Sequence, residues 1–381
     1  MRKSDDIYQR LAAHLDDLPA GFPATKSGVE LRILRRLFTE DEAAMAVLLS
    51  VLPEGPESVA VRAGLPVAET ARRLEAMSRK GLIYRLLRED GSFRYSANQY
   101  VIGIWEYQVN RLDPEIVRDM DEYIETLMID GSWKETPQLR TIPIMESLPV
   151  RHEVLAHERA AEMLNDHDRF LIAPCICRRE RKMAGQGCGK LEDACLIMGG
   201  GVEYYEQNGM GRRIDREEAL ALLKRADEEG LVLQPSNAKR IANICMCCGC
   251  CCGVLRTIKK HPHPAEFVSS PFRAALDEAA CEDCGICLTR CPMDALTRNA
   301  EGKLRLDPGR CIGCGLCVST CSGKSLVLVR KPEAEQRDVP ATFRRTYVDM
   351  ARRRGKIKPA RLAKAWVRTK IKVRPAPSKQ G

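Results

Sequence analysis

The stretch CEDCGICLTRCP, residues 281–292, and the stretch CIGCGLCVSTCS, residues 311–322, decide how this chain is organised. Both have the spacing C-x2-C-x2-C-x3-C, with Pro292 directly after the first run. Three thiolates at such short intervals can bind three irons of one cubane, while the fourth cysteine, carried outward by the following turn, binds the neighbouring one. The repeated spacing therefore predicts two [4Fe-4S] clusters. Zinc also binds pairs of C-x2-C, but eight cysteines in this doubled pattern favour iron and sulfide.

From about Phe267 to Arg330 the chain resembles the two-cluster bacterial ferredoxins. The resemblance implies that each cluster takes three cysteines from one run and the last cysteine of the other. It assigns Cys281, Cys284, Cys287 and Cys321 to one cluster, and Cys311, Cys314, Cys317 and Cys291 to the other. The family usually has a second proline where this chain has Ser322. That difference affects the reduction potential of the cluster that Cys321 binds.

Local patterns around these runs agree with a ferredoxin-like fold. Asn299–Gly302 lies between two short stretches, 295–298 and 303–306, and predicts a hairpin. Residues 325–329 predict a matching terminal strand.

The middle of the chain holds a second set of cysteines. Its members are Cys175, Cys177, Cys188, Cys195, Cys245, Cys247, Cys248, Cys250, Cys251 and Cys252. Gly249 and Gly253 let the backbone turn tightly, so that alternate sulfurs can converge. We expect at least one further iron–sulfur cluster, built from the Cys175 group and part of the Cys245 group. Zinc, or a mixture of ligating and redox-active thiols, is the alternative.

The repeated Cys-Cys-Gly of this set resembles the cysteine-rich domains of heterodisulfide reductases. The resemblance implies an unusual cluster at a catalytic site, although the long flanking spacings of that family are absent. Catalysis at the Cys245 group is therefore a further hypothesis.

Other signals surround the middle cysteines. Arg178, Arg179, Arg181 and Lys182 either offset the charge of a cluster, receive an acidic redox partner, or form a solvated basic turn. Asp215 is expected to cap a helix over 216–229 that ends at Gly230.

Two segments begin like nucleotide-binding motifs but are incomplete. Residues 187–190 lack the remaining residues of a phosphate loop, and residues 209–211 lack those of a dinucleotide fingerprint, so we predict neither nucleotide nor flavin. The histidines of 261–264 alternate with prolines and indicate a rigid connector.

The N-terminal third has a helical pattern followed by a hairpin. Helices are expected over 7–15, 29–38, 41–52, 57–63 and 67–80, with a strand from Gly81 and a hairpin tip at Asp90-Gly91. Over about fifty-five residues this order resembles winged-helix domains. The resemblance implies that helix 67–80 would lie in a DNA major groove, with Arg72 and Arg73 near the DNA and Arg94 on the wing. Winged helices also serve as protein-docking modules.

Composition and charge narrow the class of protein. The N-terminus has no apolar core typical of a secretory signal, and no apolar run approaches the ~20 residues that span a bilayer, so we expect a cytoplasmic protein without a transmembrane segment. Eighteen cysteines in such a chain indicate metal ligands, not disulfides.

The positive net charge is concentrated in the C-terminal tail. Residues 330–381 hold 17 Lys or Arg against 4 Asp or Glu, so the +9 net charge of the chain belongs to this tail. The tail could bind an acidic partner, nucleic acid or an anionic membrane, or be a solvated, partly disordered extension.

Together these patterns predict an α+β fold class, a mainly helical multidomain chain. Its expected parts are a winged-helix-like domain at 1–105, a linker helix at 114–129 within a cysteine-rich domain at 106–265, a ferredoxin-like domain at 266–331 and a basic tail at 332–381. The leading hypothesis is an iron–sulfur electron-transfer protein that serves a partner oxidoreductase, a component more than a stand-alone enzyme. The alternative is a redox-sensing winged-helix transcription regulator. Catalytic residues are not predicted.

Overall fold

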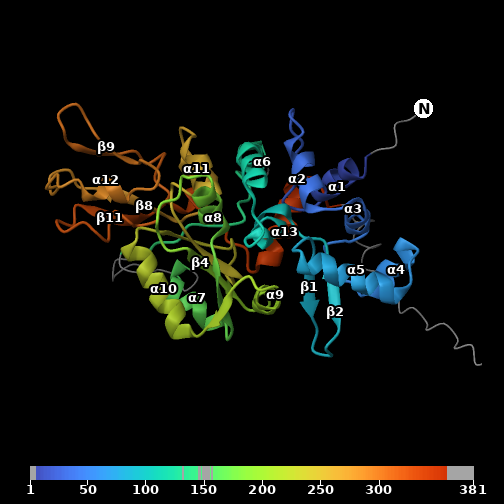
Figure 1. The fold of residues 1–381 in the computed structure, drawn as a ribbon. Helices are drawn as coiled ribbons and strands as arrows, with labels where there is room; N and C mark the ends of the chain where they lie inside the picture. The colour runs from blue at the N-terminus through green and yellow to red at the C-terminus, as the bar shows by residue number, and fades with distance from the viewer. Residues whose placement is uncertain (1–5, 131–132, 145–146, 148–154, 156–157, 358–381) are drawn as a thin grey trace, which may run out of the picture. The chain divides into compact units, whose positions relative to one another are not determined.

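A computed structural model describes residues 6–130, 133–144, 147, 155 and 158–357 of the chain (Figure 1). Two compact units are present: Met1–Gln108 with Arg354–Gly381, and Val109–Arg353. Among the described residues, no helix is both long and apolar enough to cross a membrane.

The first unit consists of five helices and one hairpin in the described region. The helices are α1 (Ile7–Asp16), α2 (Val29–Leu37), α3 (Glu40–Ala46), α4 (Pro56–Ala63) and α5 (Val67–Arg79), and strands β1 (Tyr84–Leu87) and β2 (Phe93–Ser96) pair antiparallel. Thr39 and Glu42 form a capping box that starts α3. This helix ends at Ala46, so the prediction of a helix through Leu52 was too long. The other four helices and the hairpin lie where the sequence predicted them.

The middle of the second unit is built on a five-stranded antiparallel sheet in the order β5-β3-β4-β7-β6. Its strands are β3 (Phe170–Pro174), β4 (Asp193–Met198), β5 (Arg212–Ile214), β6 (Val232–Pro235) and β7 (Asn243–Cys247). The prediction of a mainly helical chain missed this sheet. The strands are only three to six residues long, and tertiary pairing decides such short segments more than propensity does.

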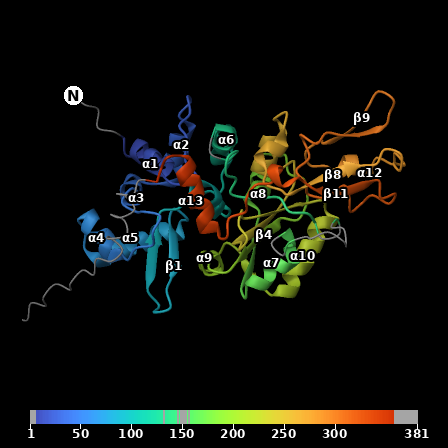
Figure 2. The same cartoon turned by 180° about the vertical axis from the view of Figure 1, so that it is seen from behind.

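Helices connect and cover these strands. They are α6 (Pro114–Glu125), α7 (Ala160–Met163), α8 (Ile176–Met183), α9 (Gly201–Gln207), α10 (Arg216–Glu228) and α11 (Gly253–Lys259). In both views α8 and α11 lie above strand β4, and α7 and α10 lie below it (Figures 1 and 2). A π turn at Thr126–Asp130 follows α6, and a 3-10 turn at Leu164–Asp166 follows α7. Other short turns of these kinds lie at Tyr100–Ile104 and Glu106–Gln108 in the first unit, and at Pro264–Phe267 and Glu333–Glu335 in the second.

The C-terminal part of the second unit contains two small antiparallel sheets. β8 (Phe272–Leu276) pairs with β11 (Leu326–Arg330), and β9 (Leu296–Arg298) pairs with β10 (Leu304–Leu306). The short helix α12 (Ile286–Arg290) lies between β8 and β9 in the chain. The predicted hairpin and terminal strand are therefore confirmed. Ala274, Leu296, Leu304 and Leu326 are buried together with several of the cysteines.

The beginning of the predicted basic tail is folded. Helix α13 (Phe343–Arg353) follows an isolated bridge between Arg240 and Thr342, and the Thr346 hydroxyl donates to the carbonyl of Asn237. Arg354 donates to the Asp16 carboxylate at 2.6 Å within the first unit. Residues 358–381 lie outside the described residues, so the hypotheses about a binding partner for the tail stay predictions.

Helix α10 begins as the sequence predicted. The side chain of Asp215 accepts a hydrogen bond of 2.8 Å from the amide of Glu218, which satisfies one of the free N–H groups of the first turn.

We expect Asp215→Ala to destabilise the protein by about 1 kcal/mol because that amide loses its acceptor, which lowers the thermal midpoint by roughly 2–4 °C. Differential scanning fluorimetry under anaerobic conditions measures this. The matched control is Lys224→Ala, a substitution at an exposed position of the same helix. An equal midpoint for both variants would contradict the role of the cap.

Candidate metal centres

The eight C-terminal cysteines surround two cavities. Cys281, Cys284, Cys287 and Cys321 line the first, and Cys291, Cys311, Cys314 and Cys317 line the second. Each cavity thus combines three cysteines of one run with the last cysteine of the other. These are the two sets that the ferredoxin resemblance implied.

Close backbone packing shapes the second cavity. Gly315 has a φ of +78°, and a Cβ atom there would lie 2.1 Å from the Oγ of Ser147. Gly313 has a φ of +70°, and a Cβ atom there would lie 2.2 Å from the carbonyl oxygen of Phe272. Only glycine fits both the backbone conformation and the space at these positions. The two glycines between the cysteines of this run therefore let the loop fold around the cavity.

The two cavities differ in their access to solvent. Cys284 in the first is exposed, whereas Cys311, Cys314 and Cys317 in the second are each at most 9% exposed. Burial raises the pKa of Cys311, Cys314 and Cys317. The cysteines around the first cavity are therefore more exposed than those around the second.

Hydrogen bonds reach several of these sulfurs. The amides of Ala274 and Ala295 donate to the Sγ atoms of Cys311 and Cys291, each at 3.3 Å. The hydroxyl of Ser325 lies 3.3 Å from the Sγ of Cys321. Burial alone would raise the pKa of Cys321. Hydrogen bonds from the Ser325 hydroxyl and from the amides of Leu326, Ser325 and Lys324 outweigh burial and lower that pKa. These donors stabilise a thiolate at the position that lacks the second proline.

The ten cysteines of the middle region divide into two groups. The six-cysteine group is a chain of neighbouring thiols in the order Cys195, Cys245, Cys247, Cys252, Cys177 and Cys175. The four-cysteine group contains Cys188, Cys248, Cys250 and Cys251. Both groups combine cysteines of the Cys175 set with cysteines of the Cys245 set, and Cys188 is in a different group from Cys175, Cys177 and Cys195. A further iron–sulfur cluster built from these cysteines stays a prediction.

Strand alternation explains the six-cysteine group. Cys245 and Cys247 are two residues apart on β7 and share one face of the sheet, while Ile244 and Met246 share the other. Cys195 on β4 pairs directly with Cys245 and lies on the same face. The three remaining members come from helix starts: Cys175 precedes α8, Cys177 lies in its first turn and Cys252 precedes α11.

Polar side chains and an amide donate to sulfurs of this group. Gln234 Nε2 lies 3.8 Å from the Sγ of Cys252, Asn243 Nδ2 lies 3.5 Å from that of Cys245, and the Gly253 amide lies 3.5 Å from that of Cys177. Gln234 and Asn243 are buried. Neither side chain was among the predicted site residues. Asn243 stands two residues before Cys245, so a predicted strand would have placed it on the cysteine face.

The six thiols are unsuited to remain as free side chains. Hydrogen bonding to Cys177, together with burial, raises the pKa of Cys175, and the contact with Cys195 together with burial raises that of Cys245. Neighbouring thiolates repel one another when they are shielded from water. Metal ions remove this repulsion by replacing the protons. The donor set therefore fits a thiolate-ligated metal centre.

The four-cysteine group is more compact. Its four Sγ atoms all lie within 4.8 Å of one another, with 3.9 Å between Cys188 and Cys248 and 3.8 Å between Cys250 and Cys251. Burial raises the pKa of Cys188, but the amide of Lys190 and the three other thiols lower it to about 7. Cys188 comes from the loop after α8 and the other three from the loop after β7.

Residues 273–322 match the family model described as the 4Fe-4S dicluster domain. This chain is an iron–sulfur protein. The match covers the cysteines that surround the two cavities. No curated protein and no solved structure matches the chain. No membership of a family is therefore shown for the chain as a whole.

Of the four basic residues after Cys177, Arg178 alone is buried. It is 5% exposed, and its Nη2 donates to the Met246 carbonyl at 2.8 Å. Within the described residues its Nε and Nη1 have no hydrogen-bond partner. Burial lowers the pKa of Arg178, but the charges of Cys175, Cys248, Cys247 and Cys188 outweigh burial and raise it. Arg178 is thus a buried cation beside both cysteine groups.

The other basic residues of α8 bind carboxylates instead. Arg179 pairs with Glu192 at 2.8 Å and Arg181 with Asp121 at 3.3 Å. The prediction of a solvated basic turn is wrong for this segment, because it forms a helix with one face buried. On that face Glu180 pairs with Arg256 at 3.0 Å, and burial raises the pKa of Glu180 to about 7.

The dicluster domain packs directly against the cysteine loop of the middle region. A Cβ atom at Gly249 would lie 2.4 Å from the carbonyl oxygen of Pro292. Gly249 lies between Cys248 and Cys250, and Pro292 follows Cys291, which lines the second cavity. The backbones that carry the two sets of cysteines are therefore in contact.

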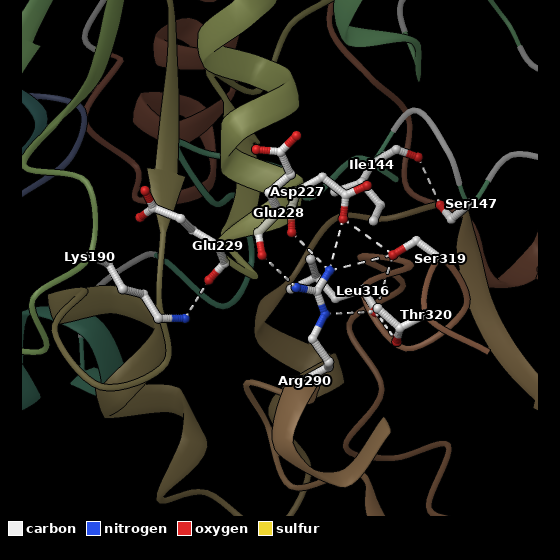
Figure 3. Close-up of polar contacts among 10 residues, drawn as sticks. All are labelled: Ile144, Ser147, Lys190, Asp227, Glu228, Glu229, Arg290, Leu316, Ser319 and Thr320. Atoms are coloured by element: carbon white, nitrogen blue, oxygen red, sulfur yellow. Dashed lines mark hydrogen bonds and ion pairs between the residues drawn. The ribbon is translucent and has the colours of Figure 1, made fainter. Parts of the chain in front are cut away.

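A second junction lies at the end of helix α10 (Figure 3). Arg290, next to Cys291, donates to the Asp227 carboxylate at 2.9 Å and to the carbonyls of Asp227 and Glu228 at 2.8 and 3.1 Å. Lys190 donates to the carbonyl of Glu229 at 2.7 Å. Cations at these free carbonyls also complement the negative end of the helix dipole. One helix end therefore binds a side chain from the dicluster domain and one from the Cys188 loop.

The N-terminal unit offers no comparable site among its described residues. On α5, Arg72 and Arg73 both hydrogen bond to Glu69, at 2.8 and 2.6 Å. These contacts offset the positive charge that was predicted to face DNA. DNA binding by this unit stays a prediction.

We expect Gly249→Ala to force apart the two backbones at this contact. Overpacking of this kind costs about 1–3 kcal/mol and should lower the anaerobic thermal midpoint by several degrees. Gly200→Ala is the matched control, because a Cβ atom at Gly200 has no neighbour within 4 Å. The contact would be refuted if both variants melted at the wild-type temperature.

Proposed function

We propose that this chain is an electron-transfer protein in which the dicluster domain exchanges single electrons with a further iron–sulfur cluster in the six-cysteine group, and so serves a partner oxidoreductase. The contact between Gly249 and Pro292 carries this proposal. It joins the cysteine loop of the middle region to the backbone next to Cys291, a residue that lines the second cavity.

The two cavities fit cubanes held by the crossing sets of cysteines. Such clusters supply one-electron chemistry at potentials set by net charge, hydrogen bonds to sulfur and solvent exposure. The two sites differ in the last of these properties. Cys284 of the first cavity is exposed, whereas Cys311, Cys314 and Cys317 of the second are buried, and Cys291 of the second adjoins the middle region.

This gradient of exposure suggests a direction for the route. A partner protein would exchange electrons at the first cavity, around Cys284. The second cavity, around Cys291, would relay them towards the middle region. Cys195, Cys245 and Cys247 supply thiolates from the sheet, and Cys175, Cys177 and Cys252 supply them from helix starts. Together they supply more thiolates than the four that one cubane requires.

No observation in the described residues favours the regulator hypothesis over electron transfer. Glu69 engages both arginines of the helix that would enter DNA.

The test is a redox titration of anaerobically purified full-length protein, followed by electron paramagnetic resonance. We expect two magnetically interacting reduced cubanes and a further signal with its own midpoint potential. A colourless protein, or one without a signal that titrates with one electron, would overturn the proposal. Electrophoretic mobility shifts with DNA in both redox states, over a range of salt concentrations, would test the regulator hypothesis.

Ser325→Ala should make the cluster at Cys321 harder to reduce. The variant loses a donor to that sulfur, and a hydrogen bond to a charged group contributes about 1.5–3 kcal/mol in other proteins. With partial compensation by the neighbouring amides, the midpoint should fall by on the order of 50 mV. Ser322→Ala is the control, because Ser322 lines the same cavity but is exposed. An unchanged midpoint in Ser325→Ala would argue against this hydrogen bond.

Arg178→Met should lower the midpoint of the middle cluster, because reduction adds negative charge beside a site that has lost its cation. At an effective dielectric constant of ~20 the lost attraction is on the order of 1–2 kcal/mol, or roughly 40–90 mV for one electron. Arg179→Met removes an equal charge that is paired with Glu192 and should shift the midpoint much less. Equal shifts in both variants would show that the position of Arg178 has no special effect.

A further inference from the structure

We propose that the four-cysteine group, Cys188, Cys248, Cys250 and Cys251, binds a single zinc ion and is separate from the iron–sulfur centres. The ion would fix the loop after α8 to the loop after β7 and would not carry electrons. The middle region would thus contain a structural metal site beside its redox site.

The distances between sulfurs support one ion. Zinc binds thiolates at about 2.3 Å, which places the sulfurs of a regular tetrahedron about 3.8 Å apart. In this group the Sγ atoms of Cys188 and Cys248 lie 3.9 Å apart and those of Cys250 and Cys251 lie 3.8 Å apart, which matches that edge. The four Sγ atoms all lie within 4.8 Å of one another. They therefore have the spacing of ligands that share one central ion.

The other cysteines provide an internal comparison. Within the described part of the chain, which includes all eighteen cysteines, this is the only group of three or more potential ligands whose atoms all lie within 4.8 Å of one another. Neither quartet around the two dicluster cavities forms such a group within the described residues. That difference is expected, because each cysteine of a cubane binds a different iron and the cluster itself lies between them.

The local sequence also suits a small ion. Three of the four ligands come from the four positions Cys248–Cys251, and Gly249 provides the turn between the first two. Cys188 stands between Gly187 and Gly189, and Gly189 has a φ of +68°. A set of four protein thiolates leaves no open position, which is typical of structural zinc sites.

Neighbouring charges complement the site. A zinc ion with four thiolates has a formal charge of −2 by valence, and Arg178 is a buried cation near Cys188 and Cys248. Lys190, two residues after Cys188, is held at the end of α10 by the Glu229 carbonyl. The loop that the zinc would fix is also the loop that contacts Pro292 of the dicluster domain. The ion would therefore keep the junction between the two metal-binding regions in place.

The experiment measures zinc, iron and acid-labile sulfide per chain in full-length protein purified anaerobically from iron-replete cells. We expect one zinc per chain in the wild type. The double variant Cys248→Ser and Cys251→Ser should lose that zinc and keep its iron and sulfide. The matched control, Cys245→Ser with Cys247→Ser in the six-cysteine group, should lose iron and sulfide and keep the zinc.

X-ray absorption at the zinc edge of the wild type keeps the proposal testable if a variant fails to fold. The proposal predicts four sulfur ligands at about 2.3 Å and no neighbouring metal. The proposal would be overturned if the Cys248→Ser and Cys251→Ser variant lost iron and sulfide, or if the Cys245→Ser and Cys247→Ser variant lost zinc. A single iron at the site, or a wild type without zinc, would also overturn it. None of these results depends on whether the protein transfers electrons, so the zinc site and the proposed function can fail independently.

Discussion

Buried thiolates can pack against one another only where metal ions replace their protons, and this constraint governs the second unit of the protein. Chains of neighbouring thiols such as Cys245, Cys247 and Cys252 would repel one another as free thiolates shielded from water. Bound metal converts the same residues into cross-links between strands and helix starts. In the proposed centres, sulfur–metal bonds would hold the sheet, the loops and the dicluster domain together alongside the apolar core.

Strand geometry and loop geometry divide the middle cysteines. On β7 the alternation of side chains sends Cys245 and Cys247 to one face of the sheet. After the strand ends, Gly249 lets the chain turn so that Cys248, Cys250 and Cys251 meet Cys188. One run of six cysteines is therefore divided between the two groups. The same glycine allows the dicluster domain to approach, which links the division of the cysteines to the proposed electron route.

The parts of the site that follow from local spacing could be predicted, and the parts that follow from strand pairing could not. The C-x2-C-x2-C-x3-C rhythm determines which C-terminal cysteines converge, because the ligands of each run are within a few residues of one another. Helix α10 was likewise predictable from Asp215 and Gly230, which mark its ends. By contrast, the pairing of Cys195 with Cys245 depends on two strands about fifty residues apart in the sequence. The buried position of Arg178 and the role of Asn243 depend on the same sheet, so neither could be read from spacing alone.

Mössbauer spectroscopy of anaerobically purified protein enriched in 57Fe tests the central claim most directly, because it counts every iron and distinguishes its environments. The account predicts more than eight irons per chain, with two cubane components and a distinct third component that disappears when Cys245 and Cys247 are replaced. Eight irons, all in two cubane components that survive this replacement, would contradict an iron–sulfur centre in the six-cysteine group.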